Sequence, residues 1–360
     1  MSARPWVVLV GGFLGAGKTT LLMAAVRELE RRGLRSAMIL NDQGDTLVDT
    51  EYAALNGIQR GEVTGGCFCC RFCDLVEVIG RLREQPLDVI FAEPVGSCTD
   101  ISATTLHPLL ACEEQIRVAP YTVLVDPQRA IDLGRDDADA SLKFLFHKQI
   151  EEADLICFTK SDLGQQVPAI EAPSVRQMSA STGQGVAAWL DEVLSAELSR
   201  GATILDIDYE QYARAEAALA WLNAEAAIRC PAPLSPAMLL GPLFERIDAE
   251  LTAAGILIVH LKAILRAQTG FVKAAICANG QEPKVEGNLD ASPATHHELL
   301  VNLRAAGSAD TVREIVERAL LGVPAEIVNR RIACFHPAPP RPERRVLAAE
   351  GGCGRKGVSA

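Results

Sequence analysis

A short run of glycines followed by lysine and threonine, near the start of the chain, has the composition of a phosphate-binding loop. Residues 11–20 read Gly-Gly-Phe-Leu-Gly-Ala-Gly-Lys-Thr-Thr. Glycines let the backbone point its N–H groups at phosphate oxygens, while the lysine can reach the β- and γ-phosphates and a threonine hydroxyl can bind Mg²⁺. A glycine-rich turn before a surface helix would not explain the Lys-Thr pair at this spacing. The predicted nucleotide contacts here are Gly12, Leu14, Gly15, Ala16, Gly17, Lys18, Thr19 and Thr20.

A second candidate site consists of closely spaced thiols. Cys67, Cys69, Cys70 and Cys73 follow two glycines, and such neighbouring positions cannot all point into one core. Thiolates at this spacing suit Zn²⁺, Cu⁺ or a related thiophilic ion, and a helix N-terminus together with Arg71 would favour the thiolate form. A redox-active pair and adventitiously clustered buried cysteines are the competing interpretations. Since Cys67, Cys69 and Cys70 supply three ligands, the site is either open or completed from elsewhere, with Cys73 as one candidate.

Three carboxylates are predicted to lie near a nucleotide-bound Mg²⁺. Asp45 and Asp49 belong to a polar loop after the predicted strand 36–40, and Glu93 ends the predicted strand 88–92. Ligands of open α/β sheets bind at the carboxyl ends of the strands, and nucleotide hydrolases place a Mg²⁺-associated carboxylate there. Turn formation in a solvated loop explains Asp45 or Asp49 equally well. We predict the catalytic residues Lys18, Thr19, Glu93 and Asp49, with Thr19 and Asp45 as metal ligands.

A later motif is typical of guanine recognition. Thr159-Lys160-Ser161-Asp162 follows the apolar run 155–158 and matches the pattern Asn/Thr-Lys-x-Asp. The Asp162 carboxylate can accept hydrogen bonds from both N1–H and the 2-amino group of guanine, a donor pair that adenine lacks. Ser179 and Ala180 follow the next predicted strand, where a backbone N–H can reach guanine O6. The predicted ligand is therefore GTP, bound through Thr159, Lys160, Asp162, Ser179 and Ala180.

The elements that would position these residues alternate between strand and helix. Such alternation predicts an α/β fold, a P-loop NTPase whose mostly parallel sheet is flanked by helices, over residues 1–200. The predicted strands are 6–10, 36–40, 88–92, 121–125, 155–158 and 174–178.

Together, residues 6 to about 198 resemble the CobW-like metal-centre GTPases, relatives of UreG and HypB. The resemblance implies a GTPase that binds a transition metal, Zn²⁺ or Co²⁺, and delivers it or a metal cofactor to a client metalloprotein or cofactor enzyme. It also implies that Cys67, Cys69 and Cys70 bind the metal, and that Lys18, Thr19 and Glu93 form the Mg²⁺-GTP machinery. The segments that carry it are 11–20, 41–49, 66–70, 93–96, 149–154 and 159–162.

This chain departs from the family pattern in four places, one of which is Gln43 in place of a common Phe. Thr159 stands where many members have Asn, and Leu40 stands where some relatives carry an acidic residue, which puts a carboxylate metal ligand there in doubt. Residues 93–98, Glu-Pro-Val-Gly-Ser-Cys, replace the commoner Glu-Thr-Thr-Gly sequence. These departures favour a divergent subgroup with its own client.

Residues 201–336 have the pattern of a smaller α+β domain. Helical spacing predicts two helices, one through Tyr212 to Ala226 and one through Leu243 to Leu251, followed by three strands and a last helix from Ser308 to Leu321. Residues 337–360 are rich in Pro and Gly and predict a disordered tail that contains Cys353. Five polar residues on the strands form either a basic face for an acidic client or ligand, or an ordinary solvated face, which we favour: His260, Lys262, Lys273, Asn302 and Arg304.

Composition excludes several function classes. The 360-residue chain has a formal net charge of −11 and is 49% hydrophobic. No basic stripe indicates a nucleic-acid partner, and no apolar run approaches the roughly 18 residues of a membrane span. The first predicted strand begins at Trp6, which leaves no room for a signal peptide, so we expect a cytoplasmic protein. We therefore expect most of its 11 cysteines to be free thiols.

Three functional hypotheses follow from these observations. The first is a metallochaperone GTPase, for which a homodimer is a candidate assembly. The second is a GTPase that guards or reactivates a cobalamin-dependent or other cofactor enzyme, with structural or redox cysteines. The third and weakest is a small-molecule kinase that uses the same phosphate loop.

Overall fold

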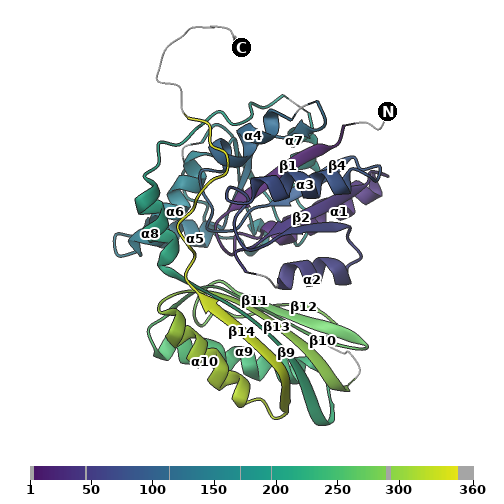
Figure 1. Ribbon diagram of the computed structural model, residues 1–360, viewed down its shortest axis with the longest axis vertical. Coiled ribbons are helices and arrows are strands. Elements are labelled where there is room, and N and C mark those ends of the chain that lie inside the picture. Colours follow the sequence, from purple (N-terminus) through teal and green to yellow (C-terminus); the bar gives the residue numbers. More distant parts are fainter. Residues whose placement is uncertain are drawn as a thin grey trace.

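The computed structural model describes residues 4–44, 47–112, 114–170, 172–195, 197–288 and 293–347, which form two parts, each built on its own sheet (Figure 1). The first sheet is parallel throughout, in the order β3-β2-β4-β1-β6-β7-β8, with β5 beside β1. This arrangement confirms the predicted P-loop fold. Its strands are β1 (Trp6–Gly12), β2 (Ser36–Asn41), β3 (Arg60–Val63), β4 (Val89–Glu93), β5 (Arg117–Val118), β6 (Thr122–Val125), β7 (Leu155–Phe158) and β8 (Val175–Gln177).

Helices cover both faces of this sheet, so its central strands are apolar on both sides. In β1, Val7 and Leu9 point into one core and Val8 and Val10 into the other. The helical segments are α1 (Lys18–Arg31), α2 (Val48–Leu55), α3 (Phe72–Leu82), η1 (Ser102–Leu106), α4 (His107–Leu110), α5 (Pro127–Gly134), α6 (Ala140–Glu151), η2 (Ser161–Leu163), α7 (Val186–Val193) and α8 (Tyr209–Ala217). Within the described ranges, no helix is both long enough and apolar enough to cross a membrane.

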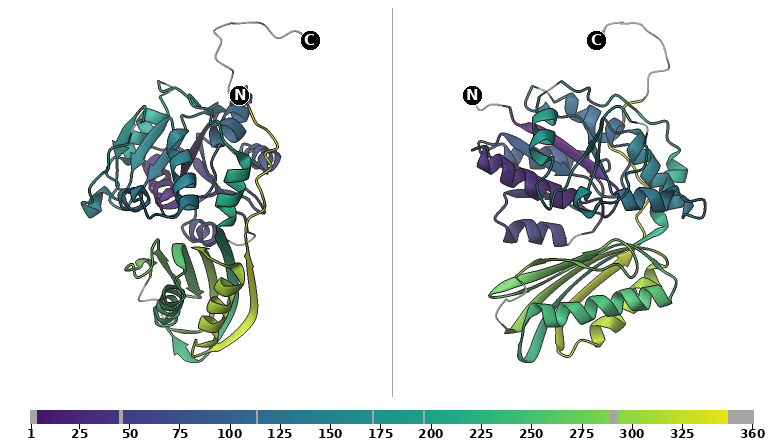
Figure 2. Two further views of the ribbon diagram at one scale, coloured as in Figure 1. Left: turned by 90° about the vertical axis from the view of Figure 1, so that its left-hand side faces the viewer. Right: turned by 180° about the vertical axis from the view of Figure 1, so that it is seen from behind.

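The second sheet is antiparallel, in the order β12-β11-β10-β13-β9-β14. Two helices cover the face that points away from the first sheet, and the other face points toward it (Figures 1 and 2). The Ser308 side chain accepts a hydrogen bond from the Thr311 backbone, which confirms the predicted cap of the last helix. The elements are β9 (Leu219–Leu234), α9 (Pro236–Ala253), β10 (Leu257–Ala267), β11 (Gly270–Ile276), β12 (Lys284–Gly287), β13 (Ala294–Ala306), α10 (Ala309–Leu321) and β14 (Glu326–Phe335).

The helix predicted through Tyr212 to Ala226 is correct only for its first part. The chain is helical in α8, which packs against α6 of the first part, and becomes a strand at Leu219. The alanine-rich sequence after Leu219 has helical spacing, but it lies between β13 and β14 and pairs with both. Pairing on both edges and burial outweigh the local preference of alanine for helix.

The segment after β14 differs from the disordered tail that its composition predicted. Residues 337–347 run back along the first part of the molecule, as the yellow trace in Figure 1 shows. The Glu343 N–H donates to the Cys69 carbonyl at 2.9 Å, and the Val346 N–H donates to the Ala103 carbonyl at 3.0 Å. Backbone hydrogen bonds of this kind do not depend on side-chain pattern, so composition alone could not reveal them. We refer to residues 337–347 as the C-terminal segment; Cys353 lies outside the described residues.

Candidate functional site

The phosphate loop joins β1 to α1 in the predicted strand-loop-helix order. Gly17 has a φ of 93° at the start of α1, and no side chain caps the first N–H groups of that helix. Such free N–H groups and the helix dipole attract anions. The Lys18 Nζ donates to the Gly12 carbonyl at 2.8 Å and is buried. Burial lowers the pKa of Lys18, whereas the Glu93 carboxylate opposes this shift.

Two oxygen donors for Mg²⁺ meet at the end of the phosphate loop. The Thr19 hydroxyl donates to the Glu93 carboxylate, at 3.0 and 3.2 Å from its two oxygens. Burial raises the pKa of Glu93, and Lys18 partly offsets it. The Asp49 Oδ1 is buried and has no hydrogen-bond partner among the described residues. This set of hard oxygen donors fits Mg²⁺. Asp45 lies outside the described residues.

Gly96 packs closely against the side chains of the phosphate loop. A Cβ atom there would lie 2.8 Å from Leu14 Cδ2 and 3.0 Å from Lys18 Nζ. The buried Gln149 side chain holds this turn, because its Nε2 donates to the carbonyls of Gly96 at 3.0 Å and Cys98 at 2.8 Å. The Gly96 backbone therefore lies where it can meet a terminal phosphate next to Lys18.

The predicted base-recognition residues are only partly gathered at this pocket. The Thr159 hydroxyl donates to the Ala16 carbonyl at 2.8 Å and so joins the two loops. The Lys160 Nζ pairs with Asp126 Oδ2 at 2.6 Å. Thr159, Lys160 and Ala180 line the same pocket as the phosphate loop, whereas Ser179 is buried beneath it. Asp162 is exposed and is not part of that lining, so its contact with guanine stays a prediction.

The second sheet supplies the other wall of the nucleotide pocket. His260, Lys262 and Lys273 line it together with the phosphate loop, and Lys262 Nζ lies 2.5 Å from Asp49 Oδ2. Burial alone would lower the pKa of Lys262, but the Asp49 and Glu93 carboxylates raise it. Burial and the nearby ammonium groups of Lys262 and Lys18 lower the pKa of His260 well below its ordinary value. The pocket is therefore a charged site shared by both sheets.

The same polar face also contacts Asp42 and the first residue of α2. Arg304 Nη2 donates to both Asp42 carboxylate oxygens, at 2.7 and 2.9 Å, and the Val48 N–H donates to Asn302 Oδ1 at 2.8 Å. Lys273, Asn302 and Arg304 are each less than a tenth exposed. The favoured interpretation of these residues as a solvated face is therefore wrong. Alternating polar residues on a strand look the same whether they meet water or a charged loop.

Three thiols form the candidate metal centre. The sulfurs of Cys67, Cys69 and Cys70 all lie within 4.8 Å of one another, and those of Cys69 and Cys70 are 3.7 Å apart. The segment is a turn rather than extended, because the N–H groups of Cys70 and Arg71 both donate to the Cys67 carbonyl. Asn41 holds this turn through hydrogen bonds to Gly66 and Phe68. Three soft donors at this separation fit a thiophilic ion.

The thiols differ in protonation and exposure. Hydrogen bonds from the thiols of Cys69 and Cys70 lower the pKa of Cys67, and the same contact with Cys67 raises the pKa of Cys70 to about 11. Cys67 and Cys69 are buried, Cys70 is partly exposed and Cys73 is exposed. Arg71 pairs with Asp74 at 2.6 Å. Hydrogen bonds within the cluster therefore favour the thiolate form of Cys67.

The C-terminal segment covers the open side of the thiol cluster. The Arg341 N–H donates to Cys70 Sγ at 3.1 Å, and Glu343 accepts a hydrogen bond from the Cys73 N–H at 2.8 Å. Arg345 anchors the segment through an ion pair with the buried Asp100 at 2.7 Å. Sequence reasoning missed this cover, as it missed the wall formed by Lys262. The only sequence signal for that wall was the polar alternation along strands of the second sheet.

Comparisons with known proteins match the first part of the chain. The family model described as the CobW/HypB/UreG nucleotide-binding domain matches residues 6–184. The zinc chaperone CobW of Pseudomonas aeruginosa is 30% identical over 188 residues, covering 43% of this chain and 48% of that protein. The zinc chaperone YjiA of Escherichia coli is 31% identical over 162 residues, covering 44% of this chain and 49% of that protein.

The chain spans about half the length of these curated relatives. Among solved structures, HypB from Helicobacter pylori in complex with nickel has a TM-score of 0.41 at 16% identity, covering 55% of this chain and 92% of that chain.

Proposed function

Because residues 6–184 form a nucleotide-binding domain of the CobW/HypB/UreG family, we propose that this protein is a GTP-hydrolysing metallochaperone that carries Zn²⁺ or a similar ion on Cys67, Cys69 and Cys70. One observation carries the proposal. A single loop, residues 93–98, begins at the carboxylate beside Thr19 and ends at Cys98, a thiol that contacts Cys67 and Cys69. The nucleotide pocket and the thiol cluster are thus neighbours along the chain and in space.

In the proposed function each residue of the nucleotide pocket has a role. The phosphate-loop backbone and Lys18 would hold the phosphates, and Thr19 and Glu93 would hold Mg²⁺, which would supply neutralising positive charge. The Gly96 backbone lies beside Lys18, where it would approach the terminal phosphate. Asp49 and its partner Lys262 close the pocket from the opposite side. Lys262 brings a positive charge to the place where negative charge develops during phosphoryl transfer.

In the proposed function the metal ion is cargo that the thiol cluster carries. Thiolates are the ligands, so binding releases protons, and hydrogen bonds from its neighbours already lower the pKa of Cys67. The zinc chaperones that match the first part of the chain support zinc as the ion. We propose a client metalloprotein or cofactor enzyme as the recipient, and a homodimer as a candidate assembly.

Three measurements on the purified chain test this function. Calorimetry should give tighter binding of GTP than of ATP, because Asp162 is assigned to guanine. Phosphate release from GTP should be slow, and the metal content after zinc loading should be about one ion per chain. Equal affinities for GTP and ATP would remove the guanine assignment, transfer of phosphate to a small molecule would indicate a kinase, and absence of bound metal would remove the chaperone role.

A further inference from the structure

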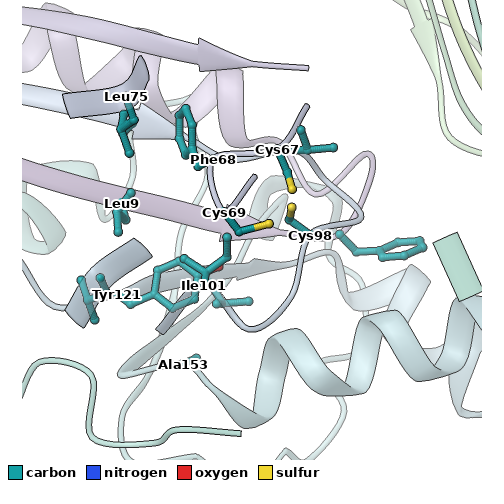
Figure 3. Close-up of a cluster of buried hydrophobic side chains, with 14 of the residues drawn as sticks. Leu9, Cys67, Phe68, Cys69, Leu75, Cys98, Ile101, Tyr121 and Ala153 are labelled. Carbon is teal, nitrogen blue, oxygen red and sulfur yellow. The ribbon is translucent and has the colours of Figure 1, made fainter. Parts of the chain in front are cut away.

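A fourth buried thiol converges on the cluster from a different segment of the chain. Figure 3 shows the sulfurs of Cys67 and Cys98 facing each other, with that of Cys69 directed toward both. Cys98 is 2% exposed, and its side chain hydrogen-bonds with Cys67 and Cys69. It is not among the three thiols that lie within 4.8 Å of one another. Cys98 therefore belongs to the buried part of the cluster, whereas Cys70 is partly exposed.

We propose that Cys98 is the fourth ligand, which closes the metal site as a tetrahedral set of four thiolates with Cys67, Cys69 and Cys70. This inference rests on the proposed metallochaperone function. Closed zinc sites have four protein ligands with zinc–sulfur distances of about 2.3 Å, whereas three ligands leave a position open for exchange. A four-thiolate site therefore retains the ion, and a three-thiolate site can pass it to a client.

The position of Cys98 in the chain links the number of thiolate ligands to the nucleotide. The loop that ends at Cys98 begins at Glu93, which accepts a hydrogen bond from Thr19, and contains Gly96, which lies against Lys18. Gln149 donates to the carbonyls of both Gly96 and Cys98, so one side chain links the two residues. Because switch loops of nucleotide hydrolases move when the γ-phosphate leaves, the number of thiolates on the ion changes with the nucleotide.

A buried carboxylate is the competing fourth ligand. Glu216 is 1% exposed, accepts a hydrogen bond from the Ser97 hydroxyl at 2.6 Å, and has a second oxygen with no partner among the described residues. Thiophilic ions favour a sulfur donor over this oxygen. A variant of each residue separates the two assignments.

The test measures zinc affinity of the full chain under a reducing agent, by competition with a chromogenic chelator, in the presence of GDP or a non-hydrolysable GTP analogue. Cys98→Ala is compared with Cys98→Ser, which keeps the side-chain size, with Glu216→Gln, and with Cys230→Ala, which removes a buried thiol from β9 in the second part. We expect zinc affinity to fall at least about 10-fold in both Cys98 variants, because even outer-shell changes cost that much. We also expect both variants to lose most of the difference in zinc affinity between the GDP form and the GTP-analogue form. Glu216→Gln and Cys230→Ala should behave as the wild type.

Cobalt absorption counts the thiolate ligands in the wild-type chain and in the Cys98→Ser variant. Substituting Co²⁺ for zinc gives sulfur-to-cobalt charge-transfer bands, whose intensity should fall by about a quarter in Cys98→Ser, since one of four thiolates is lost. A wild-type spectrum of three thiolates in both nucleotide forms would overturn the inference, as would unchanged zinc affinity in both Cys98 variants. If Cys69→Ser/Cys70→Ser also leaves zinc binding unchanged, the proposed function itself fails; if that pair abolishes binding, only the role of Cys98 fails.

Discussion

The nucleotide pocket is lined by charged side chains from both sheets, whereas the thiol cluster is enclosed by apolar side chains of the first part and by the C-terminal segment. In the pocket, the buried ammonium of Lys18 and the Lys262–Asp49 pair already interact across the boundary between sheets. At the cluster, Cys67 and Cys69 share a core with Phe68, Ile101 and other apolar residues (Figure 3). One site is prepared for a highly charged ligand and the other for a soft ion.

This difference has a consequence for mutations. A change in the pocket should alter nucleotide binding without altering metal stoichiometry, and a change at the thiols should do the reverse. The loop from Glu93 to Cys98 belongs to both regions. The predictions that follow test this separation, beginning with the largest expected effect.

Removing the Lys18 charge should disrupt the nucleotide site most strongly. Lys18→Ala deletes the buried ammonium beside Glu93 and Gly96. Loss of one partner from a buried charge pair costs about 2–5 kcal/mol, so GTP affinity should fall roughly 30- to 5,000-fold while zinc binding stays near one ion per chain. Titration calorimetry checks the affinity and mass spectrometry the metal. A variant that binds GTP as the wild type does would mean that the phosphate loop is misassigned.

Removing two thiols should disrupt the metal site and leave the pocket intact. Cys69→Ser/Cys70→Ser takes away two of the three thiols that lie together. Zinc affinity should fall by more than about 100-fold, since each lost ligand costs more than an outer-shell contact. The matched control is Cys157→Ala, which removes a buried thiol from β7. Unchanged metal content in the double variant would place the site elsewhere, and a large loss of GTP affinity would break the separation of the two regions.

The wall contributed by the second sheet should affect hydrolysis more than binding. Lys262→Met removes a positive charge beside Asp49 and Glu93, and Lys262→Arg retains it. A hydrogen bond to a charged group is worth about 1.5–3 kcal/mol, so the rate of phosphate release should fall roughly 10- to 160-fold in Lys262→Met and much less in Lys262→Arg. Thermal unfolding verifies that the variant folds despite the unpaired Asp49. Equal rates in the two variants would mean that the positive charge of Lys262 does not act in hydrolysis and that its role is structural.

The C-terminal segment should influence how fast the metal exchanges. Truncation after His336 removes the hydrogen bond from the Arg341 N–H to Cys70 and the ion pair of Arg345 with Asp100. Each ordinary hydrogen bond contributes about 0.5–1.5 kcal/mol, so transfer of zinc to a chelator should accelerate about 3- to 10-fold. Truncation after Leu347 is the matched control, because it retains these contacts and removes Cys353. If both truncations accelerate transfer equally, the cover is not the cause; GTP affinity should be unaltered in both.

The two regions also differ in how much of them the sequence revealed. Lys18, Thr19 and the thiols from Cys67 to Cys70 belong to contiguous motifs, whose spacing follows from the chemistry of phosphate and of soft metals. Their covers come from residues more distant in the sequence. Lys262 and Arg304 lie far along the chain from Lys18 and Asp42, and the docking of the second sheet brings them to this region.

The remaining errors have separate physical causes. Leu219 to Ala226 has helical spacing, but two neighbouring strands pair with it. The C-terminal segment is held largely through backbone N–H groups, which every sequence offers. Cys98 is a lone cysteine in the sequence, and the turn held by Gln149 is what places it beside Cys67. Local motifs therefore predict chemistry, whereas long-range packing decides what encloses it.

The central claim, that nucleotide and metal are coupled, is tested most directly by zinc affinity of the wild-type chain in its two nucleotide forms. Couplings between sites are typically about 1–3 kcal/mol, so the zinc dissociation constants with GDP and with a non-hydrolysable GTP analogue should differ roughly 5- to 150-fold, and zinc should shift the preference between the two nucleotides by the same factor. Identical zinc dissociation constants in the two forms would contradict nucleotide-controlled metal affinity.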